Sequence, residues 1–122
     1  MEEREMNATR NKNKNNTKST VYSTFAVLFY INRQKLKKNG RCPLMGRISI
    51  NAEMAQFSVG IDVDPKLWDA KTYRLTGRSR HAAEANYQIT QLTEKIQRYY
   101  KEILNEQGYI TAELVKNAVG GI

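Results

Sequence analysis

The amino-acid sequence predicts an α+β domain: a three-stranded antiparallel β-sheet packed against one long C-terminal α-helix, with a disordered leader at the N-terminus. Three runs with the two-residue alternation of strands follow one another between residues 23 and 63. One long run with apolar residues at three- and four-residue steps follows between residues 80 and 108. Strands followed by a helix are typical of the α+β class, because each element buries its apolar face against the other.

The N-terminal leader is predicted from its composition. Residues 1–20 are dominated by Asn, Lys and Thr and have almost no large apolar side chain. Such a segment cannot bury enough apolar surface to offset the entropy lost on ordering. Residues 1–22 are therefore expected to be disordered, and the folded domain is expected to span residues 23–108.

The three predicted strands are "STFAVLFYINR", "LMGRISIN" and "AQFSVGIDV", and alternation gives each of them one continuous apolar face. The links between them, "KLKKNGRCP" and "AEM", are short, so consecutive strands are expected to pair as an antiparallel meander. The side chains predicted to face the core are Phe25, Val27, Phe29, Ile48, Ile50, Phe57 and Ile61.

A lid for this apolar face is predicted in "RHAAEANYQITQLTEKIQRYYKEILNEQG", a helix that should end at Gly108. Its apolar stripe could instead form a coiled-coil dimer. Only about three heptads are available and the sheet still needs a cover, so the lid is favoured. The stripe consists of Ala82, Ala85, Ile89, Leu92, Ile96, Tyr99 and Ile103.

Two segments flank the predicted helix. "DPKLWDAKTYRLTG" is expected to be a loop, with Trp68 as an apolar plug at the edge of the core; base stacking by Trp68 is the alternative. In residues 109–122, Thr111 can cap a short helix that carries Leu114, Val115 and Ala118. We expect residues 109–122 to begin a linker toward a further domain.

The charge of the chain is unevenly distributed. The net charge is +8 over 122 residues, yet residues 53–122 carry equal numbers of basic and acidic side chains. Residues 21–52 have six basic side chains and no acidic one. A basic half beside a balanced half indicates a polyanionic partner. The six are Arg33, Lys35, Lys37, Lys38, Arg41 and Arg47.

Several function classes find no support in the sequence. With one cysteine, Cys42, and one histidine, His81, the chain offers neither an intrachain disulfide nor a His/Cys metal cluster. It has no catalytic motif, Gly-rich phosphate loop, signal peptide or apolar run of about 20 residues. We therefore expect a cytoplasmic, non-enzymatic domain without cofactor, metal, membrane or small-molecule substrate.

The second face of the predicted sheet carries the candidate binding residues. Arg, Asn and Gln side chains can pair with base edges in the major groove, and a basic turn can meet phosphates. An ordinary polar face with a basic hairpin fits the same residues, but the absence of acids favours DNA. The predicted base contacts are Tyr30, Asn32, Arg47, Ser49, Asn51, Gln56 and Ser58. The predicted phosphate contacts are Arg33, Lys35, Lys37, Lys38 and Arg41.

Four segments in order, "STFAVLF", "NGRCPLMGRISIN", "FSVGIDV" and "WDAKTYRLTG", resemble the N-terminal arm-type DNA-binding domain of Bacteroides-type phage and transposon integrases, which are tyrosine recombinases. The resemblance covers about residues 23–118. It rests on Phe25, Val27, Phe29, Gly40, Pro43, Arg47, Ile48, Phe57, Ser58, Gly60, Trp68, Asp69 and Asn86.

This resemblance implies a sheet inserted into the major groove of arm-type sites in double-stranded DNA, in a bacterial nucleoid. It also implies that the chain leads to core-binding and catalytic domains, with other recombinase protomers as partners. The family's catalytic Arg, His and Tyr motifs have no counterpart here, so no catalytic residue is assigned. Two alternatives stay open: an RNA-binding basic sheet, and a protein-interaction domain that uses the helix stripe.

Overall fold

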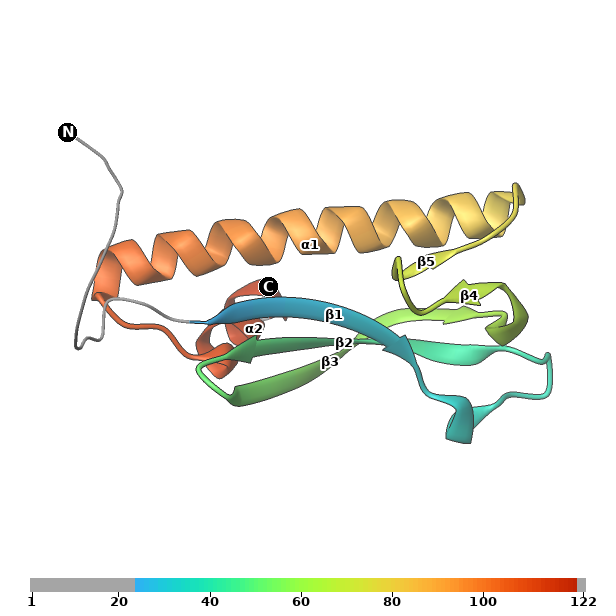
Figure 1. The fold of residues 1–122 in the computed structure, drawn as a ribbon, viewed down its shortest axis with the longest axis horizontal. Coiled ribbons are helices and arrows are strands. Elements are labelled where there is room, and N and C mark those ends of the chain that lie inside the picture. The colour runs from blue at the N-terminus through green and yellow to red at the C-terminus, as the bar shows by residue number, and fades with distance from the viewer. Residues whose placement is uncertain (1–23, 121–122) are drawn as a thin grey trace.

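The computed structural model describes residues 24–120, and the predicted leader lies outside them. Three antiparallel strands form a sheet in the order β1-β2-β3, and a long helix α1 runs along one face of it (Figure 1). The predicted sheet and long helix are therefore confirmed. Their bounds are β1 Phe25–Ile31, β2 Cys42–Ile50, β3 Glu53–Val63 and α1 Arg80–Gln107, followed by a shorter helix α2, Ala112–Gly120.

The register of the sheet places the predicted apolar residues on one face. Phe25 pairs with Ile50 across β1 and β2, and Ile48 pairs with Ala55 across β2 and β3. Between Pro43 and Met45 the pairing shifts, and β3 accommodates two extra residues near Gly60, whose φ is +93°. An even number of extra residues preserves the alternation of side chains, so the inward face continues along the whole of β3.

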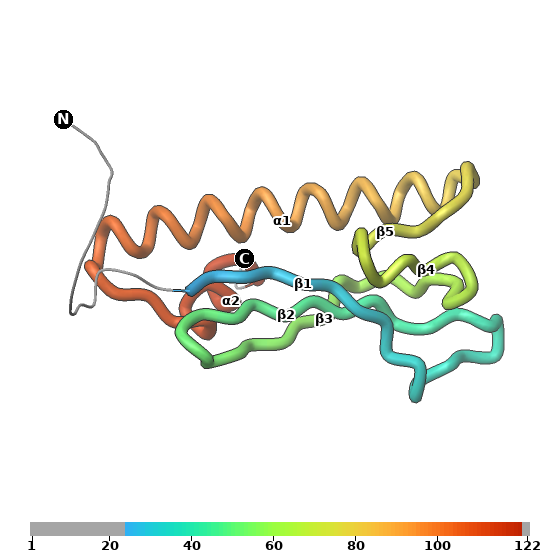
Figure 2. The backbone as a smooth tube through the Cα atoms, in the orientation of Figure 1, coloured from blue at the N-terminus to red at the C-terminus, as the bar shows by residue number. Residues whose placement is uncertain are grey.

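Helix α1 covers the inward face of the sheet, as its apolar stripe predicts (Figure 2). The Ser79 hydroxyl oxygen accepts a hydrogen bond from the Ala82 amide at 3.1 Å and caps its N-terminus. Gly108, with φ at +76°, ends the helix and donates its N–H to the Leu104 carbonyl. The most deeply buried residues of the stripe are Ala82, Ala85, Ile89 and Ile96.

Helix α2 is part of the same core. Ala112 and Val115 are buried beside Ile48, Ile50 and Ile96. The Thr111 hydroxyl oxygen accepts a hydrogen bond from the Leu114 amide at 3.1 Å, which confirms the predicted cap. The folded unit therefore continues past residue 108, which is the predicted end of the folded domain. That residues 109–122 lead to a further domain stays a prediction.

The segment between sheet and helix, expected to be a loop, contains a small hairpin of β4 (Trp68–Asp69) and β5 (Arg74–Leu75). Strands of two residues have no alternation to detect, and a tertiary contact holds the hairpin. The Asn86 side chain of α1 bonds both the N–H and the C=O of Leu75, at 2.8 and 3.0 Å. Trp68 packs against the core, as the plug interpretation predicts.

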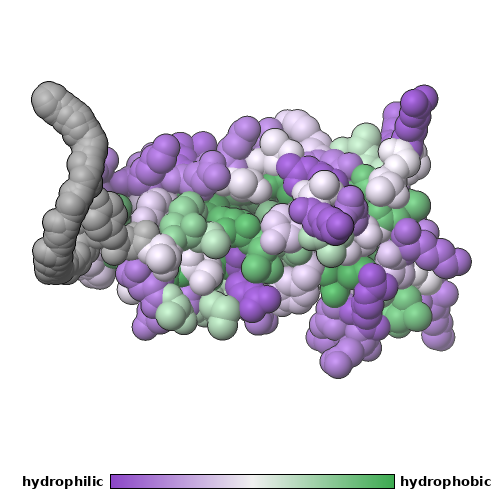
Figure 3. Space-filling view, in the orientation of Figure 1, coloured by the Kyte–Doolittle hydropathy of each residue, from purple (hydrophilic) through white to green (hydrophobic). Residues whose placement is uncertain are grey.

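Apolar side chains gather between α1 and the sheet, whereas hydrophilic ones cover the outward side of α1 (Figure 3). In this core Gly46 leaves room for an aromatic ring. A Cβ added at Gly46 would lie 2.2 Å from the ring atom Cζ of Phe57. The Phe57 ring in turn meets Phe29 edge-on, with the ring centroids 6.3 Å apart. The ring therefore cannot retreat freely.

Replacing Gly46 with alanine is expected to lower the free energy of unfolding by about 1–3 kcal/mol, the usual cost of overpacking a core. Urea denaturation measures the change. The loss should shrink in a Phe57→Leu background, where the clashing ring is absent. An equal loss in both backgrounds would show that the ring does not limit the site.

Candidate nucleic-acid interface

The outer face of the sheet, on the side away from α1 and α2, carries nine side chains in three rows. The strand pairings define the rows directly, because paired residues on one face are neighbours. Arg47 lies at the centre and is the only charged residue of the nine. We call this set the outer block. From β1 to β3 its rows are Ala26–Ser49–Met54, Leu28–Arg47–Gln56 and Tyr30–Met45–Ser58.

Five of the seven predicted base contacts lie in the outer block: Tyr30, Arg47, Ser49, Gln56 and Ser58. The two other predicted residues lie in turns and stabilise the backbone. The Asn32 side-chain oxygen accepts from the Gln34 amide at 3.2 Å and caps a 3-10 turn, Arg33–Lys35. The Asn51 oxygen accepts from the Thr24 amide at 3.1 Å, and Asn51 has a φ of +52°.

The outer block also contains four apolar residues that the sequence interpretation left out of the candidate set: Ala26, Leu28, Met45 and Met54. Alternation places Ala26, Leu28 and Met45 on this face, whereas Met54 lies in the predicted link "AEM" and joins the face only because β3 begins at Glu53. The candidate base contacts are side chains that can hydrogen-bond to base edges, whereas these four are apolar. The face is therefore less polar than the sequence interpretation implied.

Soft contacts hold the Arg47 guanidinium. Its Nη1–H donates to the Met54 sulfur at 3.3 Å, and its Cζ lies 5.6 Å from the centre of the Tyr30 ring. The Nε atom is buried and has no hydrogen-bond partner within the described residues. A guanidinium has five N–H donors and thioether sulfur is a weak acceptor. Arg47 is thus oriented by neutral groups and keeps donors for a ligand.

A basic hairpin arm, residues 32–41, joins β1 to β2 and extends past the end of the sheet (Figure 1). Two backbone hydrogen bonds close it, from Lys37 N–H to the Arg41 carbonyl and from Gly40 N–H to the Lys37 carbonyl. Arg33, Lys35, Lys37 and Lys38 are exposed and Arg41 is half-buried. The five predicted phosphate contacts therefore share one projecting element.

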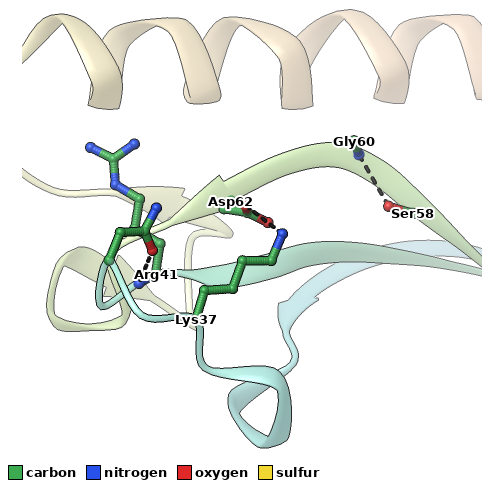
Figure 4. Close-up of polar contacts among 6 residues, drawn as sticks. Lys37, Arg41, Ser58, Gly60 and Asp62 are labelled. Carbon is green, nitrogen blue, oxygen red and sulfur yellow. Dashed lines mark hydrogen bonds and ion pairs between the residues drawn. The ribbon is translucent and has the colours of Figure 1, made fainter.

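One of these cations already has a partner. The Lys37 ammonium lies 2.8 Å from an Asp62 carboxylate oxygen on β3 (Figure 4). The pair borders a hollow of about 480 Å³ between the hairpin arm and the outer block, with Lys35 and Ser58 also in its lining. A phosphate that binds Lys37 has to compete with Asp62, so Lys37 differs from the other basic residues of the arm.

The described residues can also be searched for membrane-spanning helices and for groups of metal ligands. Between residues 24 and 120, no helix combines the length and apolar character that crossing a membrane requires. Across the same residues, no three His, Cys, Asp or Glu side chains come together to hold a metal ion. Cys42 is a buried free thiol.

Comparison with known proteins decides the family. Residues 29–116 match the Arm DNA-binding domain family, and the matched segment contains the end of β1, the hairpin arm, β2, β3, α1 and the first part of α2. The chain belongs to this family. No curated protein and no solved structure matches the chain significantly. Domains of this family bind DNA in the context of integrases and recombinases, and the arm domain is not the catalytic domain of such proteins.

Asp62 provides a test of the hairpin arm in DNA binding. In Asp62→Asn the carboxylate no longer competes with phosphate for Lys37, so duplex affinity should rise by about 0.2–1 kcal/mol, the range for an exposed ion pair. Fluorescence anisotropy at several salt concentrations measures this. The slope of log K against log salt should become more negative by up to about 0.9, the value for one phosphate contact.

Glu102→Gln is the matched control, because it changes the net charge equally at an exposed position near the C-terminal end of α1. That end of α1 and the hairpin arm lie at opposite ends of the molecule (Figure 2). An equal gain in both variants would assign the effect to net charge rather than to the Lys37–Asp62 pair.

Proposed function

We propose that the chain binds arm-type sites in double-stranded DNA as the N-terminal domain of a site-specific tyrosine recombinase. The outer block faces base edges in the major groove, and the hairpin arm lies on the phosphates. The observation that carries this proposal is the position of Arg47: it lies at the centre of the outer block, and no carboxylate within residues 24–120 forms an ion pair with it. Guanine O6 and N7 are the acceptors that arginine pairs with most often.

The division between hairpin arm and outer block supports two kinds of contact. Phosphate contacts fix position and supply affinity that depends on salt, whereas contacts to base edges supply specificity. The arm has exposed cations beyond the end of the sheet, and the outer block has donors and acceptors in Arg47, Gln56 and Ser58. In this arrangement the hairpin arm contacts phosphates and the outer block contacts base edges.

In the whole recombinase this domain holds DNA that flanks the crossover site, while core-binding and catalytic domains act elsewhere. Its partners are duplex DNA in the bacterial nucleoid and other recombinase protomers. Membership of the arm domain family supports this role.

The two alternative functions have less support. RNA-binding sheets stack two or three bases on aromatic residues. The outer block has one aromatic residue, Tyr30, and Arg47 packs against its ring. The apolar stripe of α1 is buried against the sheet and α2, which leaves it no free apolar face for a coiled coil.

A titration with three ligands of the same sequence tests the proposal: duplex DNA, single-stranded DNA and duplex RNA. Anisotropy should show preference for duplex DNA, and amide shift changes should cluster on the outer block and hairpin arm. With about five phosphate contacts, the slope of log K against log salt should be roughly −4 to −5. Equal binding of the three ligands, or shift changes confined to α1, would contradict the proposal.

A further inference from the structure

The apolar side chains of the outer block raise a separate question. Met54 is 59% exposed at one corner of the block, and Leu28 and Met45 are half-buried elsewhere on the same face, which no described element covers. With Ala26 and Tyr30, five of the nine residues of the block are apolar or aromatic. Ala26, Leu28 and Tyr30 follow one another along β1 on this face, and Met45 pairs with Tyr30. Such a contiguous apolar group on an exposed surface marks a binding site.

Charge indicates what covers this face. Arg47 stands among the apolar residues, the adjoining hairpin arm is cationic, and residues 21–52 contain no acid. A polyanion with an apolar element satisfies both features. Among the base edges in the major groove, thymine alone presents an apolar group, its C5 methyl.

Building on the DNA-binding mode proposed above, we infer that the outer block recognises a guanine with thymines beside it. Arg47 pairs with the guanine, and Leu28, Met45 and Met54 pack against thymine methyl groups. Leu28 is the cross-strand neighbour of Arg47, and Met45 lies two positions along the same strand. These correspond to separations of about 5 and 7 Å. Base pairs rise about 3.4 Å, so the methyl groups lie within about two steps of the guanine.

Met54 has a second role in this arrangement. Its sulfur accepts the Nη1–H of Arg47, so the same side chain orients the guanidinium and offers an apolar surface. The Leu28 side chain is a hydrocarbon without a hydrogen-bonding group, so it contributes apolar surface alone. Leu28 is therefore the cleaner position for testing methyl recognition.

The experiment begins with selection of the preferred duplex from a random pool by the full chain. The selected duplex is then compared with a version in which deoxyuridine replaces every thymidine, which removes the methyl groups and preserves the base pairing. Anisotropy at fixed salt should show a loss of about fourfold for each methyl group buried on binding. Because this comparison changes only the DNA, it does not depend on the folding of a variant.

A protein variant assigns the effect to the outer block. Leu28→Ala should bind the thymidine duplex more weakly and show a smaller ratio between thymidine and deoxyuridine affinities. Tyr109→Ala is the matched control: Tyr109 is a large side chain, 58% exposed, just after the C-terminal end of α1. It should leave both the affinity and the ratio unchanged.

The outcomes separate the inference from the proposed function. Tight binding of the selected duplex with equal affinity for its deoxyuridine version would overturn methyl recognition and leave DNA binding intact. A selected site without thymine within two steps of a guanine would do the same. Failure to enrich any duplex, together with no preference for duplex over single strands, would overturn both.

Discussion

Truncating Ile96 to alanine is expected to lower the free energy of unfolding by about 2–5 kcal/mol, the range for emptying a core site. Ile96 is fully buried where α1, α2 and the sheet meet, beside Ile48, Ile50 and Val115. Residues from three elements line the site, so it cannot collapse without moving a helix. Urea denaturation followed by circular dichroism measures the loss.

The control for Ile96→Ala is its neighbour Gln97→Ala, on the exposed side of α1, which should change stability by less than about 0.5 kcal/mol. Phe29→Ala tests the other end of the core and is expected to cost about 2–5 kcal/mol as well, because Phe29 is 3% exposed. If Ile96→Ala unfolded at the same urea concentration as Gln97→Ala, α1 would not be the cover of the sheet.

Arg47→Ala is expected to lower affinity for the preferred duplex by about 1–3 kcal/mol, with a smaller loss on random DNA. The reason is the central position of Arg47, with donors left over from its contacts to Met54 and Tyr30. Anisotropy with both duplexes gives the specificity ratio. An unchanged urea midpoint for the variant would show that the loss is in binding and not in folding.

Two variants separate base reading from charge. Arg47→Lys keeps the positive charge but not the planar fork, so it should retain random binding while losing most of the specificity. Lys38→Ala removes an exposed cation of the hairpin arm and should weaken all duplexes alike, with the salt slope reduced by about 1. If Arg47→Ala weakened specific and random duplexes equally, the outer block would not read sequence.

Sequence reasoning succeeded where a residue's role follows from its own segment. A period of two sorted each strand into two faces, and steps of three and four placed Ala85, Ile89 and Ile96 on the covered side of α1. The caps at Thr111 and Gly108 were likewise visible as local residue preferences. A count of charged residues along the sequence was enough to predict that the hairpin arm is basic.

Sequence reasoning was incomplete where a role depends on a distant partner. Asn51 has the side-chain chemistry of a base reader, but its oxygen accepts a hydrogen bond from the Thr24 amide, 27 positions away. In the sequence Lys37 has the features of a phosphate contact, but in the folded chain its ammonium pairs with Asp62, 25 positions away.

By itself the sequence therefore determined the strand faces, the covering helix and the basic arm, since periodicity and composition are properties of one segment. Only the tertiary structure decided that α2 joins the core, that Asn86 holds the small hairpin, and that Arg47 lies between Tyr30 and Met54. These contacts depend on strand register and helix packing, which bring together side chains from separate segments. No single segment encodes such a neighbour, because its position is set by the free energy of the whole core.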